Sequence, residues 1–226
     1  MLSRIALIHA VAVAMPPVAA AFRELWPEAE CINLLDDSLS LDRQRAGDLT
    51  PAITRRIAAL AAYARDCGAD GILYTCSAFG QAIDAAANAS DVPVLKPNQA
   101  MFDEALRRGR RIGMLATFEP SVAGMEAEFH AQASMLAVAG SSSGASITTV
   151  CVPGAMAALQ AGDGAAHDAL LADAARAFNA RGLDALMLAQ FSMARARDAV
   201  SAVCACPVLT SPHSAVRLLK ERLARG

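Results

Sequence analysis

Cys76 is the residue of this chain whose type and position best suit chemistry. It follows the short apolar run Ile72-Leu73-Tyr74, and Thr75-Cys76-Ser77-Ala78 leads into a helical pattern. The amides and dipole at a helix N-terminus stabilise a thiolate, so this position predicts a lowered thiol pKa and a role as base or nucleophile. The same amides, with the hydroxyls of Thr75 and Ser77, could hold a carboxylate oxygen. A small buried apolar side chain is the structural alternative for a free cysteine.

An internal duplication relates Cys76 to a second position in the chain. At an offset of 114 residues, Gly68–Ser77 aligns with Gly182–Phe191 and Pro93–Leu95 with Pro207–Leu209. Internal repeats of this kind indicate repeated structural units. The alignment places Gln190 where the first half has Cys76.

Side chains around Gln190 could bind a substrate but are poor bases. Gln190 and Ser192 can form hydrogen bonds, and Phe191 could supply an apolar wall. The structural alternatives are a helix cap for Ser192 and core packing for Phe191. This second strand end is therefore predicted to bind a ligand without exchanging protons.

Other predicted strand ends add polar candidates. His9 ends the first strand and could donate to a carboxylate, although a structural histidine is more common. Thr117, Glu119 and Ser121 follow another strand, where helix capping competes with substrate binding for Thr117. His130 and His167 fall within helical patterns and are expected on solvated faces.

Short apolar runs alternate with helical patterns along the chain, which predicts an α/β fold with parallel sheets. The expected strands are Ile5–Ile8, Cys31–Leu35, Gly71–Tyr74, Val92–Leu95, Ile112–Ala116, Ile147–Cys151, Ala185–Ala189 and Pro207–Leu209. The expected helices include 18–26, Pro51–Cys67, Ser77–Asn88, Gln99–Arg108, Ser121–Gln132, His167–Arg181, Met193–Val203 and Ser214–Leu223. Gly140–Gly144 is predicted to be a surface loop.

The duplication predicts two pseudo-symmetric, doubly wound halves. A second match, at an offset of 107 residues, aligns Arg4–Ile8 with Arg111–Leu115. We expect one half to comprise residues 1–98 and 210–226 and the other residues 99–209. Ligands bind at the carboxyl ends of strands in such folds, so the active site is expected in a cleft between the halves.

Composition excludes several classes of protein. The net charge is -2, and no concentrated run of Lys or Arg is present, so no nucleic-acid partner is expected. No run reaches the roughly 20 apolar residues of a membrane span. The apolar segment Ile5–Met15 resembles a signal peptide but is interpreted as a strand because the duplication uses it.

Cysteine spacing and glycine motifs limit the expected location and cofactors. The six cysteines lack the spacing of a disulfide framework, which favours a reducing cytoplasm. Cys204-x-Cys206 is a weak indication of metal binding, because paired thiolate ligands are usually separated by two residues, and no metal site is expected. No glycine-rich phosphate loop or dinucleotide fingerprint is present, so no nucleotide cofactor is expected.

The duplication, Thr75-Cys76-Ser77, Leu188–Phe191 and Arg111–Thr117 together resemble the aspartate/glutamate racemase superfamily. That group includes hydantoin racemase, maleate isomerase and arylmalonate decarboxylase. The resemblance covers nearly the whole chain and implies cofactor-independent chemistry at a carbon next to a carboxylate. It implies that Cys76 is catalytic and that Ser77, Ala78 and Thr117 bind a small carboxylate substrate. A homo-oligomer is left open.

The chain departs from the family pattern at Gln190. In the family's racemases a cysteine from each half faces the substrate, one removing and one delivering a proton. Gln190 cannot deliver a proton, so two-base racemisation is in doubt. Isomerisation or one-base epimerisation by Cys76 is the first hypothesis. Decarboxylation of a substituted malonate is the second, and a non-catalytic small-molecule binding protein is the third.

Overall fold

The chain contains two compact units, each with its own four-stranded parallel sheet. The computed structural model describes residues 2–138 and 144–225. The first unit comprises residues 1–100 and 215–226, and the second comprises residues 101–214. The predicted loop at Gly140–Gly144 lies, apart from Gly144, outside the described residues. The predicted α/β class with parallel sheets is confirmed.

The sheet of the first unit has the strand order β2-β1-β3-β4. Its elements are β1 (Arg4–His9), η1 (Ala12–Ala14), α1 (Met15–Leu25), β2 (Glu30–Leu35), α2 (Ser38–Ala46), α3 (Pro51–Asp66), β3 (Gly71–Tyr74), η2 (Ser77–Phe79), α4 (Gly80–Asn88) and β4 (Val94–Leu95). The C-terminal helix α10 (Ser211–Arg225) ends in this unit.

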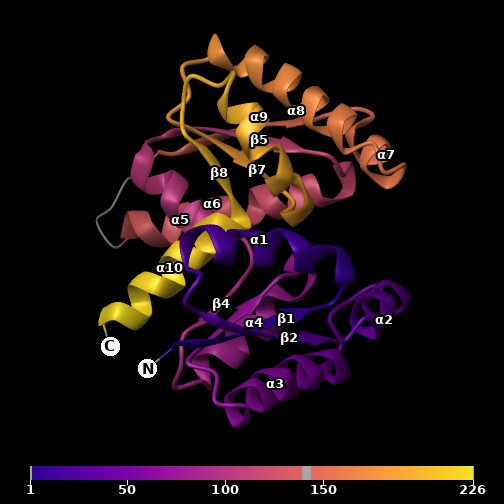
Figure 1. The fold of residues 1–226 in the computed structure, drawn as a ribbon, viewed down its shortest axis with the longest axis vertical. Helices are drawn as coiled ribbons and strands as arrows, with labels where there is room; N and C mark the ends of the chain where they lie inside the picture. The colour runs from indigo at the N-terminus through magenta and orange to yellow at the C-terminus, as the bar shows by residue number, and fades with distance from the viewer. Residues whose placement is uncertain (1, 139–143, 226) are drawn as a thin grey trace. The chain divides into compact units, whose positions relative to one another are not determined.

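Alternate residues of the central strands in this unit are buried on opposite faces of the sheet. Ile8 and Ile72 pack with residues of α3 and α4, including Ile57, in one apolar cluster. On the other face, Gly71 lies against Leu219 of α10. Figure 1 shows α3 and α1 on opposite faces of this sheet. Both faces are covered, as a parallel sheet requires, so its central strands are almost continuously apolar.

The sheet of the second unit repeats this topology with the order β6-β5-β7-β8. Its elements are α5 (Gln99–Arg108), β5 (Arg111–Ala116), η3 (Glu119–Ser121), α6 (Val122–Val138), β6 (Ser146–Cys151), α7 (Ala155–Gln160), α8 (Gly164–Asn179), β7 (Ala185–Leu188), η4 (Phe191–Ala196), α9 (Arg197–Ser201) and β8 (Val208–Thr210). In Figure 1, α8 and α6 cover opposite faces of the sheet.

The duplicated Gly-x-Asp sequence has the same structural role in both units. Gly68 and Gly182 have φ angles of 77° and 58°, in the left-handed region that favours glycine. The aspartate two residues later accepts a hydrogen bond from the backbone N–H of the first residue of the neighbouring strand. The distance is 2.8 Å from Arg4 N to Asp70 Oδ2 and from Arg111 N to Asp184 Oδ2. The repeated Gly-x-Asp sequence therefore forms the same connection in both units, between α3 and β3 and between α8 and β7.

Some helical segments differ from the prediction. The short helices α2 and α7 were not predicted, and Ser77–Asn88 begins with a 3-10 turn, so its α-helix starts at Gly80. His167 was expected on a solvated face, which is wrong. It is fully buried on α8, and its Nδ1 lies 2.8 Å from Asp168 Oδ1. Burial of one helix face and the adjacent aspartate account for a histidine inside this helix.

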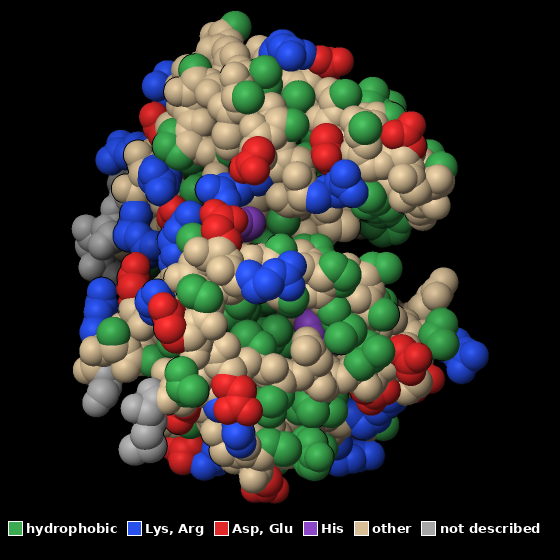
Figure 2. All heavy atoms as spheres, viewed as in Figure 1, with side chains coloured by type: hydrophobic (Ala, Val, Ile, Leu, Met, Phe, Trp, Pro, Cys, Tyr) green, Lys and Arg blue, Asp and Glu red, His purple; other side chains and the backbone are tan. Residues whose placement is uncertain are grey.

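The described residues contain no helix long and apolar enough to cross a membrane. On the face drawn in Figure 2, acidic and basic side chains are interspersed. That distribution accords with the small net charge of -2.

Candidate active site

The ends of three strands in the first unit are joined by the side chain of His9. His9 is the last residue of β1, and its Nδ1 lies 2.8 Å from Thr75 Oγ1, just after β3. Its Nε2 lies 2.9 Å from Oδ1 of Asn33 in β2. Thr75 Oγ1 also lies 3.3 Å from the carbonyl oxygen of Ile8. The structure thus brings two predicted site residues, His9 and Thr75, into direct contact.

His9 is fully buried, and burial lowers its imidazole pKa despite the opposing effect of the Asn33 hydrogen bond. A neutral imidazole carries one N–H. With Asn33 Oδ1 as the acceptor at Nε2, that proton lies on Nε2, and Nδ1 accepts from the Thr75 hydroxyl. Both nitrogens are thus engaged within the protein. These hydrogen bonds support a positioning role for His9, because they hold Thr75, which directly precedes Cys76.

Cys76 is half-buried at the carboxyl end of β3, beside the apolar cluster of the first unit. The expected lowering of its thiol pKa is wrong. Burial raises the pKa, and hydrogen bonds to the Ala78 backbone N–H and the Ser40 side chain only partly offset that effect. A 3-10 turn of three residues follows Cys76, so the aligned dipoles of a long helix are absent at this point.

Ser77 and Ala78 lie in this 3-10 turn, and both are exposed. The Ala78 N–H points to the thiol, as its hydrogen bond to Cys76 requires. Ser77 contributes a hydroxyl group to this exposed turn. Ser40, which sequence reasoning missed, lies in α2; its single hydroxyl proton is shared between Cys76 and the carbonyl oxygen of Ala10, 3.0 Å from the Ser40 oxygen.

In the second unit, Gln190 follows β7 and is held by residues that follow β5. Its Oε1 accepts from the backbone N–H of Thr117 at 3.0 Å and lies 3.2 Å from the Thr117 hydroxyl. Its Nε2 donates to Ser121 Oγ at 3.1 Å. The Gln190 oxygen thus occupies the two Thr117 donors that were expected to bind a carboxylate. A ligand carboxylate that used those donors would have to displace Gln190.

The neighbours of Gln190 differ in exposure. Phe191 is 7% exposed and begins η4, so most of its ring is packed within the unit. Ser192 is half-buried in the same 3-10 helix. Of the predicted residues in the second unit, the structure therefore connects Thr117 and Ser121 to Gln190 through hydrogen bonds.

A second thiol at this sheet edge was missed by sequence reasoning. Cys151 is the last residue of β6 and pairs with Ala116, which precedes Thr117. Burial raises the pKa of the Cys151 thiol, and the hydrogen bond and negative charge of Glu119 raise it further. Its position at the end of a predicted strand was the available signal, because parallel strands end at one edge. The thiol stays protonated at neutral pH and is a potential proton donor.

The His, Cys, Asp and Glu side chains of the described residues are dispersed. Across residues 2–138 and 144–225, no group of three or more His, Cys, Asp or Glu side chains is arranged to hold a metal ion. The groups placed at the strand ends are thiols, hydroxyls, amides, one neutral imidazole and the carboxyl group of Glu119. Such groups suit proton transfer and hydrogen bonding to an oxyanion.

The two repeated parallel sheets, with thiol and amide groups at their strand ends, define a duplicated α/β class of protein. The chain belongs to the Asp/Glu/hydantoin racemase family, whose model matches residues 11–222. No curated protein sequence matches it.

Solved structures of racemases have the same fold. An aspartate racemase homologue from Pyrococcus horikoshii OT3 is 14% identical, with a TM-score of 0.75 over 99% of this chain and 100% of the other. Allantoin racemase from Klebsiella pneumoniae is 18% identical, with a TM-score of 0.73 over 99% and 89%. Glutamate racemase from Bacillus anthracis is 13% identical, with a TM-score of 0.67 over 99% and 83%.

Proposed function

We propose that this protein is a cofactor-independent isomerase of the racemase type that acts at a carbon next to a carboxylate or carbonyl group, with Cys76 as its proton-transferring residue. The carrying observation is the half-buried thiol at the carboxyl end of β3, with hydrogen bonds from Ala78 and Ser40. Racemase family membership supports the reaction class.

The chemistry assigned to Cys76 is removal and return of an α-proton. The thiolate removes the proton, and the substrate becomes an enediolate or enolate with negative charge on oxygen. Hydrogen-bond donors placed at that oxygen lower the barrier, and such preorganised donors are commonly a large contribution to catalysis. The exposed Ser77 hydroxyl is the candidate donor in the first unit. Ionisation of Cys76 must occur against burial, so its Ala78 and Ser40 hydrogen bonds support the thiolate form.

A small carboxylate is the substrate class that we favour. The similar structures include racemases named for glutamate, aspartate and allantoin, so the fold accepts more than one compound class. These substrates share a carbon–hydrogen bond made acidic by an adjacent carbonyl group. The proposed reaction therefore takes place at the carbon next to this carbonyl group, and a screen of compounds identifies the rest of the substrate.

A second candidate is decarboxylation of a substituted malonate. It is favoured by the raised pKa of Cys76, because a thiol that remains protonated can donate its proton to the carbanion left by loss of carbon dioxide. The Gln190 side chain exchanges no proton and is hydrogen-bonded to Thr117 and Ser121, which accords with a reaction that needs no second base.

The test is proton exchange in deuterium oxide. The parent protein is incubated with chiral amino acids, hydantoins, maleate and substituted malonates, while NMR follows α-deuteration and chiral chromatography follows configuration. We expect deuteration or isomerisation of at least one compound, and at least a hundredfold loss in Cys76→Ala. Cys67→Ala, which removes another half-buried thiol of the first unit, should retain full activity.

The outcomes separate the candidates. Release of carbon dioxide from a malonate, dependent on Cys76, would assign the lyase instead of the isomerase. Absence of exchange and product across the panel, combined with saturable binding of a compound, would indicate a non-catalytic binding protein. Activity that persists in Cys76→Ala would overturn the assignment of this thiol.

A further inference from the structure

Two further thiols meet at the amino edge of the second sheet. Cys204 and Cys206 lie in the connection between α9 and β8, and their Sγ atoms are 3.4 Å apart. Gln190 follows the opposite end of β7, about 20 Å away along the strand direction at roughly 3.3 Å per residue. The pair is therefore distant from Gln190, and Cys76 belongs to the other unit, so any role of the pair is independent of the proposed activity.

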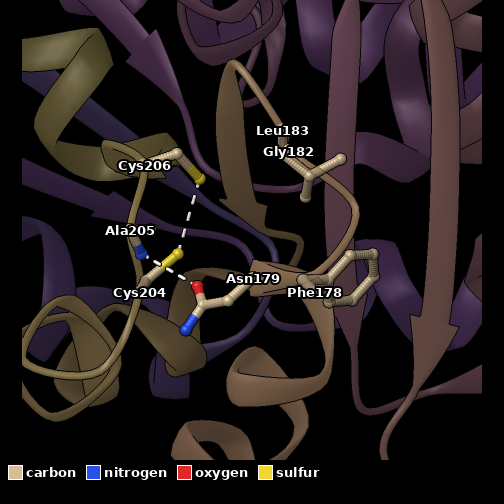
Figure 3. A pocket seen from close by; sticks show the side chains of 7 residues that line it. All are labelled: Phe178, Asn179, Gly182, Leu183, Cys204, Ala205 and Cys206. Carbon is tan, nitrogen blue, oxygen red and sulfur yellow. Dashed lines mark hydrogen bonds between the residues drawn. The ribbon is translucent and has the colours of Figure 1, made fainter.

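The side chain of Asn179 fixes the backbone that carries the two thiols. Asn179 Oδ1 accepts from the Ala205 N–H at 2.9 Å, and its Nδ2 donates to the Val203 carbonyl oxygen at 2.7 Å. These bonds hold the chain on both sides of Cys204. In Figure 3 the two sulfur atoms point toward each other, with the Asn179 oxygen directed at the Ala205 nitrogen. Because these two hydrogen bonds from Asn179 already hold the loop, the loop loses less conformational entropy when the two sulfurs are joined.

The thiols also border a small cavity of about 30 Å³, comparable to the space of one water molecule. It is lined by Phe178, Asn179, Gly182, Leu183, Cys204, Ala205 and Cys206 (Figure 3). Both cysteines are half-buried, and Ala205 between them is exposed. A small reagent can therefore approach the pair from solvent, whereas the apolar side chains limit approach from the sheet.

We propose that Cys204 and Cys206 form a redox-active dithiol that a small-molecule disulfide, such as oxidised glutathione, converts to an intramolecular disulfide. The present separation is that of a sulfur–sulfur hydrogen bond. A disulfide bond is about 2.05 Å long, so the sulfurs must approach by about 1.4 Å.

The two sulfurs have different roles in this reaction. Burial and the neighbouring Cys204 raise the pKa of the Cys206 thiol, so Cys206 is the sulfur that retains its proton. The Cys204 thiolate attacks one sulfur of the small disulfide, which forms a mixed disulfide and releases one thiolate. That thiolate takes the proton from Cys206, and the Cys206 sulfur then attacks Cys204 and displaces the second thiolate, which is protonated by solvent. Overall, two protein thiols are oxidised and one disulfide is reduced to two thiols.

The experiment exposes the folded protein to oxidised glutathione, alkylates the remaining thiols and analyses tryptic peptides by mass spectrometry. Cys204 and Cys206 share the peptide Asp198–Arg217. We expect this peptide to escape alkylation and to weigh about 2 Da less than its reduced form, the mass of two hydrogen atoms removed by oxidation. Dithiothreitol should restore both alkylatable thiols. Recovery of the peptide with two alkylated cysteines, or with a persistent glutathione adduct, would overturn the proposal.

Variants separate the roles of the residues. Cys206→Ser should trap a glutathione adduct on Cys204, whereas Cys204→Ser should react at least tenfold more slowly. Asn179→Ala should slow ring closure several-fold, so that the mixed disulfide accumulates in the otherwise intact dithiol. Cys67→Ser serves as the matched control and should leave closure unchanged. Equal closure rates in the parent and Asn179→Ala would contradict the proposed role of Asn179.

Discussion

Opposing local effects determine the chemistry of Cys76. Burial favours the neutral thiol, whereas hydrogen bonds from Ala78 and Ser40 favour the thiolate. Because burial has the larger effect, the residue is mainly a proton donor at neutral pH and becomes a base only as the pH rises. A proton-abstracting activity should therefore increase with pH through the range above the ordinary thiol pKa of about 8.5.

Replacing Ser40 tests this balance directly. Ser40→Ala removes a hydrogen bond that lowers the Cys76 pKa, so we expect the pKa to rise further. At neutral pH, iodoacetamide should then modify Cys76 several-fold more slowly, and the midpoint of the pH–rate profile should move to higher pH. Mass spectrometry of the Cys76 fragment measures both. Ser38→Ala in the same helix is the control, and a Ser40→Ala midpoint that is unchanged or lower would contradict the role of Ser40.

Gln190 is the residue whose replacement should alter the reaction outcome. Gln190→Cys introduces a thiol at the position that the duplication aligns with Cys76, and it frees the Thr117 N–H and hydroxyl. We expect the variant to racemise a substrate that the parent protein deuterates without inversion, because the new thiol stands at the position aligned with Cys76. Chiral chromatography in deuterium oxide measures the inversion. Gln190→Ala should show none, and retention of configuration in Gln190→Cys would refute the prediction.

The sequence located these strand-end residues but could not assign all their contacts. Cys76 and Gln190 were identified because the duplication aligns them after equivalent strands. The contact between Gln190 and Thr117 joins residues 73 positions apart. The pKa direction at Cys76 depends on how deeply its thiol is buried, which the order of residues along the chain does not specify.

Among the structural elements, the turns that lead into β3 and β7 are held by the repeated aspartates. Asp184 Oδ2 accepts from the backbone N–H groups of Arg110 and Arg111, each at 2.8 Å. These hydrogen bonds are the main reason why the Asp184 pKa is below its ordinary value. The Asp184 carboxylate thus connects the loop before β7 to the first residue of β5.

Asp184 should contribute to stability in a pH-dependent way. A carboxyl group with a lowered native pKa stabilises the folded state above its unfolded pKa of about 3.9, and this contribution is lost as the pH falls through the native pKa. Asp184→Asn should therefore unfold more easily than the parent at pH 7, with the difference decreasing toward pH 3. Urea unfolding at both pH values measures it. A difference that is the same at both would contradict the ionic contribution.

The positions of the strands were predicted more closely than those of the helices. Buried parallel strands are short apolar runs, and β3 begins and ends as expected. The helix α2 was missed because Ser38–Ala46 contains only one buried residue, Leu39, and so lacks an apolar stripe. The turn after Cys76 was predicted as α-helix because periodicity does not distinguish a 3-10 beginning from an α-helical one.

In the molecule as a whole, each unit has its own apolar core. The second core includes Phe102, Phe129 and Leu186, and the first includes Ile8 and Ile72. The first unit is discontinuous in sequence, because residues 215–226 return to it. Leu219 is fully buried in this returning segment, and Gly71 leaves room for its side chain beside β3.

Truncating Leu219 should weaken the first unit. Leu219→Ala removes a buried side chain and leaves a cavity, with an expected loss of about 2–5 kcal/mol in the free energy of unfolding. Urea unfolding measures the loss, and hydrogen exchange locates it in β1 and β3. Leu41→Ala, at a side chain that is 52% exposed, should change stability by less than about 0.5 kcal/mol. Unchanged hydrogen exchange in β1 and β3 would contradict the proposed stabilisation of these strands by Leu219.

The return of α10 also has a consequence for synthesis on the ribosome. Residues 101–214 emerge before residues 215–225, so all of the second unit's residues are available while the first unit still lacks Leu219. Part of one apolar face of the first sheet therefore stays uncovered until residues 215–225 emerge. Domains can fold as units during synthesis, so the unit that begins first is the one that finishes last. During that interval, the part of the sheet face that Leu219 later covers is exposed to water.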